Sequence, residues 1–435
     1  MSEPLTTQLA AARNGRITPA MEQVAQREKQ SVEFIRSGVA AGRIVIPANK
    51  NHTNLHCMGI GRELYTKINA NIGNSALTGT PEDELKKLQS VLDYGADTVM
   101  DLSTGGDLDL IRSSIIKASS IPVGTVPVYE VVCRYGRNGI TPENILQVIE
   151  SQASQGVDYM TIHAGLLRQL LPAALKRKLG IVSRGGALIA ARMVESGLEN
   201  PFYTAFDDIL DICRKYDVTI SLGDGLRPGC LADASDEAQF GELAILGELT
   251  RSCRAADVQV MVEGPGHIPA DQIAMNMERE KAVCDDAPFY ILGPVVTDCA
   301  PGYDHLVGAM GGLLGAIHGA AMLCYVTPKE HIGLPDDEDV RRGIMAFRIA
   351  AHAADVALHK PDARLRDDAI SDARESFDWE KQFALALDPE RARTYRADAL
   401  KVSNQPDLHG GEFCTMCGPD FCSVRLSKIL KSAKF

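Results

Sequence analysis

Three cysteines near the C-terminus have a spacing that could support chemistry. Cys414, Cys417 and Cys422 form a C-x2-C-x4-C pattern around a Gly-Pro turn. A structural zinc site takes four protein ligands, and no fourth cysteine follows these three. A [4Fe–4S] cluster on three thiolates would keep one iron open for a small molecule such as S-adenosylmethionine. The spacing therefore favours an iron–sulfur cluster, with zinc plus a distant histidine and a redox dithiol as the alternatives.

The other eight of the 11 cysteines stand singly, in mostly apolar surroundings. We interpret them as small buried hydrophobic residues rather than as ligands. A chain of 435 residues that begins without an apolar signal segment is typical of a reducing compartment, where disulfides are rare. We therefore expect a cytoplasmic protein.

A second group of candidate residues lies at the ends of apolar runs between residues 65 and 334. Runs such as VDYMTIHAG and VQVMVEGPG alternate with helical segments. Apolar strands separated by helices indicate a parallel sheet, and their number favours an α/β fold, a (β/α)8 barrel. Most runs end in a polar or special residue: Asn71, Asp101, Tyr129, His163, Ser183, Arg184, Asp224 and Glu263. We expect these residues to form an active site, because barrel enzymes build theirs at the carboxyl ends of the strands.

The elements that must position these residues divide the chain into four expected parts. A small N-terminal region takes residues 1–64 and the catalytic barrel takes 65–334. A charged, alanine-rich helical extension follows over 335–400, and a cluster-binding tail over 401–435.

Composition and patterning exclude two classes of partner. A net charge of −12 and few aromatic residues (5%) leave neither a basic stripe nor stacking platforms for nucleic acid. Residues 306–326 form an apolar run long enough to span a membrane. Its spaced glycines and its place among amphipathic helices favour a buried helix that runs into a strand. We therefore expect no nucleic acid and no membrane as partners.

Several longer motifs carry a resemblance to a known family. They include INANIGNS, MDLSTGG, IHAG, VSRGG, LGDGLRPG, VEGPGH, APGYDH and YVTPKEH, followed by CTMCGPDFC. In this order they resemble the phosphomethylpyrimidine synthase family of radical S-adenosylmethionine enzymes, over nearly the whole chain. The resemblance implies a (β/α)8 barrel with a small N-terminal region and a cluster on the C-terminal tail. It also implies a homodimer, whose tail reaches the partner's active site, and a low-potential electron donor such as ferredoxin or flavodoxin.

The resemblance implies two metal centres. Cys414, Cys417 and Cys422 would hold the [4Fe–4S] cluster that binds S-adenosylmethionine. His267, in EGPGH, and His331, in PKEH, would bind zinc. Two imidazoles suit a metal whose other positions are filled by water or substrate.

The substrate implied by the resemblance is 5-aminoimidazole ribotide. It would be held by Asn71, Met100, Tyr129, His163, Ser183, Arg184, Gly185, Asp224, Gly225, Leu226, Arg227, Glu263 and Tyr290. Backbone N–H groups and arginine forks suit its phosphate. Asp224 and Glu263, as catalytic residues, could hold ribose hydroxyls or move protons.

The resemblance allows two products from this ribotide. Most members of the family make the hydroxymethylpyrimidine phosphate of thiamin, whereas an anaerobic paralogue makes 5-hydroxybenzimidazole, the precursor of a cobamide (vitamin B12) lower ligand. Here Leu306-Val307-Gly308 follows APGYDH, where the thiamin branch is expected to carry a Thr-Ser pair. Fewer hydroxyls beside the site would change the cavity, so we expect a radical carbon–carbon lyase that makes 5-hydroxybenzimidazole. The alternatives are the thiamin pyrimidine and, more remotely, a zinc-dependent barrel aldolase or hydrolase.

Overall fold

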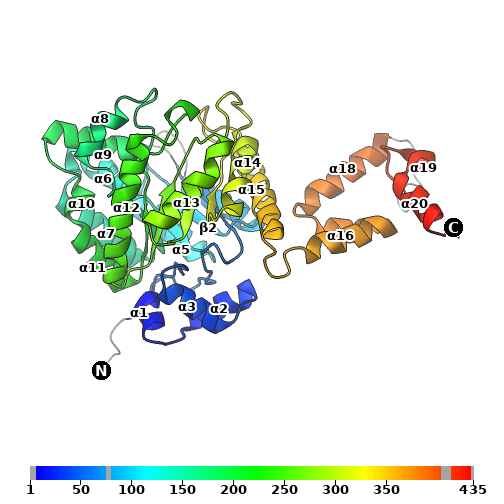
Figure 1. Cartoon of the computed structure of the whole chain (residues 1–435), viewed down its shortest axis with the longest axis horizontal. Helices are drawn as coiled ribbons and strands as arrows, with labels where there is room; N and C mark the ends of the chain where they lie inside the picture. The colour runs from blue at the N-terminus through cyan, green and yellow to red at the C-terminus, as the bar shows by residue number, and fades with distance from the viewer. Residues whose placement is uncertain (1–5, 75–79, 403–412, 433–435) are drawn as a thin grey trace. The chain divides into compact units, whose positions relative to one another are not determined.

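The computed structural model describes residues 6–74, 80–402 and 413–432. The chain forms two compact units, residues 1–360 and residues 361–435. Figure 1 shows the helices and strands of both units.

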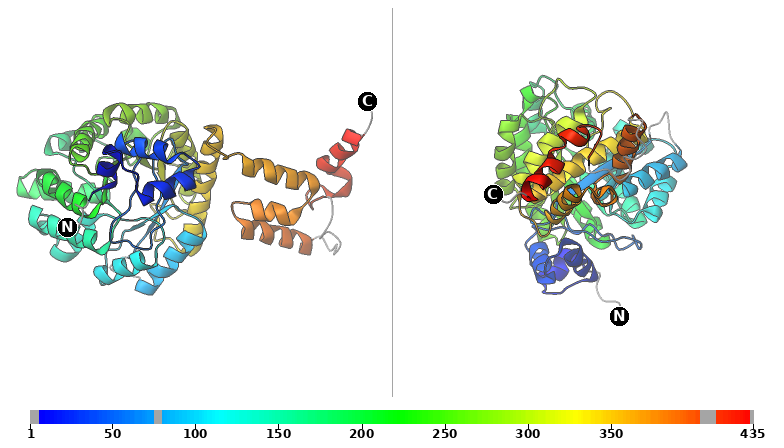
Figure 2. Two further views of the ribbon diagram at one scale, coloured as in Figure 1. Left: turned by 90° about the horizontal axis from the view of Figure 1, so that it is seen from below. Right: turned by 90° about the vertical axis from the view of Figure 1, so that its right-hand side faces the viewer.

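Eight parallel strands close into a barrel in the first unit, seen along its axis in Figure 2. They are β1 (Lys67–Ile72), β2 (Thr98–Asp101), β3 (Val123–Thr125), β4 (Tyr159–Ile162), β5 (Thr219–Leu222), β6 (Val260–Gly264), β7 (Phe289–Leu292) and β8 (Met322–Cys324). Each strand pairs with the next in the chain, and β1 closes the ring by pairing Lys67 with Met322 of β8. Nearly every strand residue is buried, which explains the almost continuous apolar runs. The expected (β/α)8 barrel is confirmed.

Helices surround the barrel (Figure 2). They are α4 (Pro81–Asp93), α5 (Leu108–Ala118), α6 (Pro127–Tyr135), α7 (Pro142–Gln155), α8 (Leu171–Ala174), α9 (Arg184–Ser196), α10 (Pro201–Thr204), α11 (Phe206–Tyr216), α12 (Glu237–Ala255), α13 (Ile273–Val283), α14 (Asp304–Ile317) and α15 (Asp337–Ala357). Four short 3-10 helices lie between them, at Arg137–Gly139, Arg168–Leu170, Leu231–Asp233 and Ala270–Gln272. Local sequence fixes many of the starts: Thr80 and Thr141 each accept a backbone N–H at the N-cap and are followed by proline.

The N-terminal helices form a separate small core below the barrel. They are α1 (Gln8–Arg13), α2 (Pro19–Glu28) and α3 (Val32–Ala40). Met21, Val24 and Ile35 pack together and are fully buried. Glu28 forms a buried ion pair, at 2.9 Å, with Lys67, the first residue of β1. This region therefore lies at the amino ends of the strands, opposite the end where the active site is expected (Figure 2).

The apolar run over 306–326 is a helix followed by a strand, as expected from its sequence. It comprises most of α14 and all of β8. Glycine at position 311 is required by close packing, because a Cβ there would lie 1.9 Å from the backbone oxygen of Pro294. None of the helices in the described ranges is both long and apolar enough to cross a membrane.

Helix α15 belongs to the first unit, although its residues were expected in the helical extension. Its Ile344 and Phe347 are fully buried. Asp355 accepts hydrogen bonds from the backbone N–H of Thr66, at 3.0 Å, and from the Thr66 hydroxyl, at 2.8 Å. Thr66 directly precedes β1, the first strand, and α15 follows β8, the last strand. These hydrogen bonds therefore connect the start of the barrel sequence to its end.

The second unit is helical. It contains α16 (Leu365–Ser376), α17 (Trp379–Leu385), α18 (Pro389–Val402), α19 (Gly418–Phe421) and α20 (Ser423–Ser432). The guanidinium of Arg396 lies over the Trp379 ring at 4.0 Å, which joins α17 to α18. Residues 403–412 of the expected tail lie outside the described residues.

Candidate active site

A cavity opens at the carboxyl ends of the strands. Its lining residues are Asn71, Met100, Leu102, Val126, Tyr129, Thr161, His163, Asp224, Arg227, Glu263, Gly264, Tyr290, Leu292 and Cys324. Eight of the residues expected to hold the substrate are therefore brought to one place: Asn71, Met100, Tyr129, His163, Asp224, Arg227, Glu263 and Tyr290. They come from seven different strands or the segments that directly follow them, which is the arrangement that barrel enzymes use.

Two carboxylates and one guanidinium form the charged wall of the cavity. Asp224 Oδ1 accepts a hydrogen bond from Arg227 Nη1 at 2.9 Å. Glu263 Oε1 accepts from the hydroxyls of Thr161 and Ser221, both at 2.7 Å. Burial, followed by the nearby charge of Asp224, raises the pKa of Glu263 to about 7. Glu263 can therefore either give or take a proton near neutral pH.

The SRGG motif places the start of a helix next to His163, a lining residue, although Ser183, Arg184 and Gly185 do not themselves line the cavity. Ser183 is the N-cap of α9, where its hydroxyl accepts from the Gly186 N–H, and it also lies 3.3 Å from His163 Nε2. A Cβ on Gly185 would meet the His163 ring at 2.5 Å, so only glycine fits there. Burial, with the positive charge of Arg227, lowers the pKa of His163 to about 3, which keeps the imidazole neutral. The backbone N–H groups of the first turn of α9 suit an anionic group.

Arg184 and Tyr129 form a second contact at this end of the barrel. The Arg184 guanidinium lies over the Tyr129 ring, 5.2 Å from its centroid. Tyr129 belongs to α6, which starts directly after β3. The arginine is exposed, so its charge remains available to a ligand at the cavity mouth.

Gly225 and Leu226 shape the site from behind, and neither is among the lining residues. Leu226 is fully buried, and its backbone N–H donates to Glu242 Oε2 at 2.7 Å. A Cβ at Gly186 would lie 2.2 Å from the Gly225 oxygen, so the turn after β5 packs directly on α9. These residues set the position of Asp224 and Arg227.

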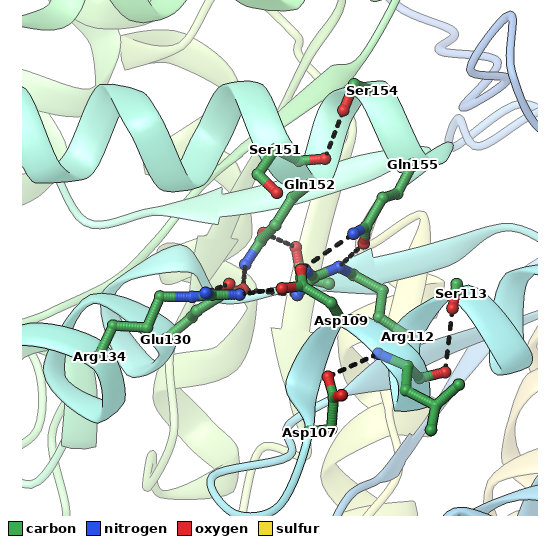
Figure 3. A network of polar contacts seen from close by, with 12 residues as sticks. Asp107, Asp109, Arg112, Ser113, Glu130, Arg134, Ser151, Gln152, Ser154 and Gln155 are labelled. Carbon is green, nitrogen blue, oxygen red and sulfur yellow. Dashed lines mark hydrogen bonds and ion pairs between the residues drawn. The ribbon is translucent and has the colours of Figure 1, made fainter.

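A network of charged and polar residues, shown in Figure 3, includes Glu130, the residue that follows Tyr129 in α6. Arg112 of α5 pairs with Glu130 of α6, and Glu130 also accepts from Arg134 Nε and from Gln152 Nε2 of α7, both at 2.6 Å. The network ties three helices together directly beside Tyr129. Asp101, a strand-end candidate, faces this side rather than the cavity and accepts from the Ser103 N–H at 3.0 Å.

Residues missed at the level of sequence include Cys324, which lines the cavity, and Asn69, which is fully buried and is not among the lining residues. Asn69 Nδ2 donates to the Tyr290 hydroxyl at 2.7 Å, and Asn71 Nδ2 lies 3.3 Å from Cys324 Sγ. Asn69 and Asn71 alternate along β1, a pattern that places both on the inner face of a strand and could have identified Asn69. Cys324 is hidden in the apolar run LCYV. Burial raises the pKa of its thiol to about 11, so it stays protonated at neutral pH.

The two candidate zinc ligands lie close together. The ring centroids of His267 and His331 are 5.3 Å apart. Asp298 Oδ1 lies 2.8 Å from His267 Nδ1, and Asp304 Oδ1 lies 3.6 Å from His331 Nδ1. Carboxylates in these positions orient imidazoles that bind a metal through the other nitrogen. His331 also has a left-handed backbone (φ 61°), a conformation that non-glycine residues adopt mainly at constrained sites.

The donor chemistry of these histidines fits a metal whose remaining positions are taken by water or substrate. Across the ranges that the structure describes, no three His, Cys, Asp or Glu side chains are gathered into a metal-binding group. This holds for the two histidines with their carboxylates and for the three cysteines of the tail.

The three tail cysteines flank α19 in the second unit. Cys414 is partly buried, Cys417 is exposed and Cys422 is buried. The Gly418 N–H donates to the Cys414 oxygen at 3.1 Å, which closes a turn between the first two cysteines. Three thiols within one short loop are suitable ligands for iron, and binding would have to draw their sulfur atoms together.

The family model described as the radical SAM ThiC family matches residues 7–429. The chain belongs to this family. It is 59% identical over 430 residues to the phosphomethylpyrimidine synthase of Natronomonas pharaonis, covering 99% of this chain and 90% of the relative. It is 59% identical to the enzyme of that name from Haloarcula marismortui (98% and 88% covered) and 57% identical to that from Halobacterium salinarum. Membership of a radical SAM family implies a [4Fe–4S] cluster and S-adenosylmethionine.

The expectation of 5-hydroxybenzimidazole as the product is wrong. The relatives with 57–59% identity are phosphomethylpyrimidine synthases, the activity kept above as the alternative. The structure gives the physical reason, because Leu306, Val307 and Gly308 do not line the cavity. Leu306 is exposed, and a Cβ at Gly308 would point at Phe347 of α15, at 3.0 Å. Losing hydroxyls at these positions therefore leaves the hydrogen bonding of the cavity unchanged.

Proposed function

We propose that the protein is a phosphomethylpyrimidine synthase. It converts 5-aminoimidazole ribotide into 4-amino-5-hydroxymethyl-2-methylpyrimidine phosphate, the pyrimidine precursor of thiamin, as a carbon–carbon lyase. The observation that carries this proposal is the identity of 57–59% to phosphomethylpyrimidine synthases over nearly the whole chain. The cavity at the barrel mouth, with Asp224, Arg227 and Glu263 in its wall, supports it.

Each part of the ribotide has a matching group of residues. Ser183, Arg184 and Gly185 at the start of α9, with the Arg227 guanidinium, would bind the phosphate. Asp224 and Glu263 on the charged wall would accept hydrogen bonds from the ribose hydroxyls.

Other lining residues would hold the aminoimidazole. Asn71, Met100 and Tyr290 offer an amide, a thioether and a hydroxyl around one corner of the cavity. His163, kept neutral, can accept or donate one hydrogen bond to the ribotide without adding charge. Gly225 and Leu226 contribute by holding the turn that carries Asp224.

The cofactors would bind at the remaining candidate residues. Cys414, Cys417 and Cys422 would hold the [4Fe–4S] cluster, and His267 and His331 would hold zinc. Bound by these cysteines, a reduced cluster would supply an electron for cleavage of S-adenosylmethionine, and so the radical chemistry of the rearrangement. During the reaction the cavity residues would bind and orient the ribotide, exclude water and keep their protons in place. We also propose that the enzyme is a homodimer and that it works in the cytoplasm under anaerobic conditions. Its electrons would come from a low-potential donor such as ferredoxin or flavodoxin.

Identification of the reaction product tests the proposal. The anaerobically reconstituted enzyme is incubated with 5-aminoimidazole ribotide, S-adenosylmethionine and a low-potential reductant, and products are separated and identified by mass. We expect the pyrimidine phosphate, and 5-hydroxybenzimidazole as the main product would contradict the proposal. Cys417→Ala should lose both cluster iron and product. Cys133→Ala, a matched change at another exposed cysteine, should keep both.

A further inference from the structure

A buried carboxyl group lies directly behind the charged wall of the active site. Glu242 of α12 is 2% exposed. One of its oxygens, Oε2, accepts from the Leu226 N–H at 2.7 Å. The other, Oε1, is buried and has no hydrogen-bond partner among the described residues, and the same is true of Asp224 Oδ2.

Glu242 and Asp224 both line a small cavity behind the active site. Asp224, Arg227, Glu263 and Gly264 line both this cavity and the larger one, so they form the wall between them. The rear side is completed by residues of α12, α13 and neighbouring segments: Gln239, Glu242, Leu243, Leu246, Pro265, Asn276 and Phe289. The cavity offers about 20 Å³ to the centre of a water molecule, enough for one.

The charges around Glu242 leave it without a cation of its own. Asp224 is paired with Arg227. Arg177, the other guanidinium that acts on Glu242, donates to both carboxylate oxygens of Asp236, at 2.6 and 2.7 Å. Burial, and then the charge of Asp224, raises the pKa of Glu242 well above its ordinary value. A neutral acid is therefore the stable form, and its O–H would point into the cavity.

We propose that Glu242 is the proton reserve of the active site, held as a neutral carboxylic acid that passes its proton to Asp224 through one water molecule in the rear cavity. In this step the Glu242 O–H bond breaks and the water takes the proton. The same water gives another of its protons to Asp224 Oδ2, so that negative charge moves from Asp224 to Glu242. The Leu226 N–H stabilises the new carboxylate. The inference rests on the proposed function, because it supplies the proton to a ribotide bound at Asp224.

Glu242→Gln tests this step because glutamine keeps an acceptor for the Leu226 N–H but carries no transferable acid proton. The variant should melt like the wild type and bind the ribotide with unchanged Kd, measured by calorimetry on the holoenzyme. Its kcat for pyrimidine formation should fall about 10²-fold, as for loss of an acid group in proton transfer. The wild-type kcat should also decline as pH rises through the pKa of Glu242, and this alkaline decline should be absent in E242Q. Glu242→Asp, which keeps an acid, should recover part of kcat.

Infrared spectroscopy gives a readout that does not depend on turnover. The carbonyl band of one protonated carboxylic acid should be missing from E242Q. Glu280→Gln is the matched control, since Glu280 is also buried and has an oxygen without a partner among the described residues, but faces Asp286 and Arg254 instead of the active site. E280Q should lose an acid band while keeping kcat and its pH profile.

Three results would overturn the inference. They are a wild-type kcat and pH profile in E242Q, loss of ribotide binding in E242Q, and an infrared spectrum that E242Q leaves unchanged. If the wild type makes no pyrimidine phosphate, the proposed function fails, and the infrared comparison alone then decides whether Glu242 holds a proton.

Discussion

Burial controls the protonation of individual side chains throughout this barrel. The pKa of His163, which is buried, falls to about 3, whereas that of Glu263, which is partly buried, rises to about 7. The sign follows from chemistry, because removing water penalises whichever form is charged. The cavity therefore holds a neutral imidazole beside a carboxyl group that changes charge near neutral pH.

The pKa of His52 changes in the opposite direction from that of His163, because each ring nitrogen of His52 has a hydrogen-bond partner. Nδ1 lies 2.7 Å from Asp158 Oδ2 and Nε2 lies 3.0 Å from the Ser119 oxygen. A carbonyl oxygen can only accept, and Asp158 already accepts from the Asn49 and Val123 N–H groups, so both nitrogens carry protons. Burial alone would lower the pKa of His52, but Asp158 and Ser119 outweigh it and raise the pKa.

We predict a pH-dependent stability that comes from His52. A raised folded-state pKa adds stability that is fully present below about pH 6.5, the unfolded value, and is lost as pH rises through the folded pKa. The difference in unfolding free energy between wild type and His52→Gln, from urea denaturation, should therefore shrink as pH rises. His318→Gln, at an exposed position, should give no such trend, and a constant difference for His52→Gln would contradict the prediction.

Residue type at the end of an apolar run was sufficient to find part of the cavity lining, and the family resemblance added Met100, Arg227 and Tyr290. Asn71, His163, Asp224 and Glu263 stand out because polar groups have no packing reason to end a buried strand. Cys324 could not be found in this way, because its own side chain is nearly apolar. Glu242 could not be found either, because it lies mid-helix and only the fold brings it behind Asp224.

At the scale of the elements, helix α14 packs through its glycines. A Cβ at Gly311 would lie 1.9 Å from the Pro294 oxygen, a backbone atom that cannot rotate away. The glycine spacing in the sequence predicted that this helix is buried. It did not predict that the backbone of Pro294 is the group that requires glycine at position 311. Nearer the start of the same helix, Leu306 is exposed and Gly308 faces Phe347 of α15, so changes at these positions leave the cavity lining unaltered.

We predict that Gly311→Ala destabilises the protein by about 1–3 kcal/mol, as overpacking of a close contact does. Alanine is intrinsically the better helix former, by about 1 kcal/mol, so helix propensity alone would give the opposite sign. Thermal and urea unfolding measure the difference. Gly333→Ala, where a Cβ meets nothing within 4 Å, should change stability by less than about 0.5 kcal/mol. A stabilising Gly311→Ala would show that the contact is not tight.

At the scale of the whole molecule, the chemistry is divided between the two units. Every residue that lines the active-site cavity belongs to the unit of residues 1–360, and all three clustered cysteines belong to residues 361–435. The barrel also contains its own closing contacts, including the hydrogen bonds from Thr66 to Asp355.

A chain that ends at Lys360 should therefore fold and bind the ribotide but hold no cluster. We expect a single cooperative unfolding transition by circular dichroism, ribotide binding by calorimetry and no iron after reconstitution. The full-length chain, treated in the same way, is the control. Loss of the cooperative transition on truncation would show that the barrel depends on the second unit.

Closure of the barrel has a consequence for synthesis on the ribosome. Asn69 and Cys324, which meet where β1 pairs with β8, are 255 positions apart. At about 5–20 residues per second, translation of that interval takes roughly 10–50 s, during which β1 has no partner on one edge. Strand β8, which provides the missing partner of β1, also supplies Cys324, the lining residue of the cavity that is made last. A nascent or prematurely terminated chain thus cannot present a finished pocket to its substrate, and ligand binding reports that the whole barrel has been made.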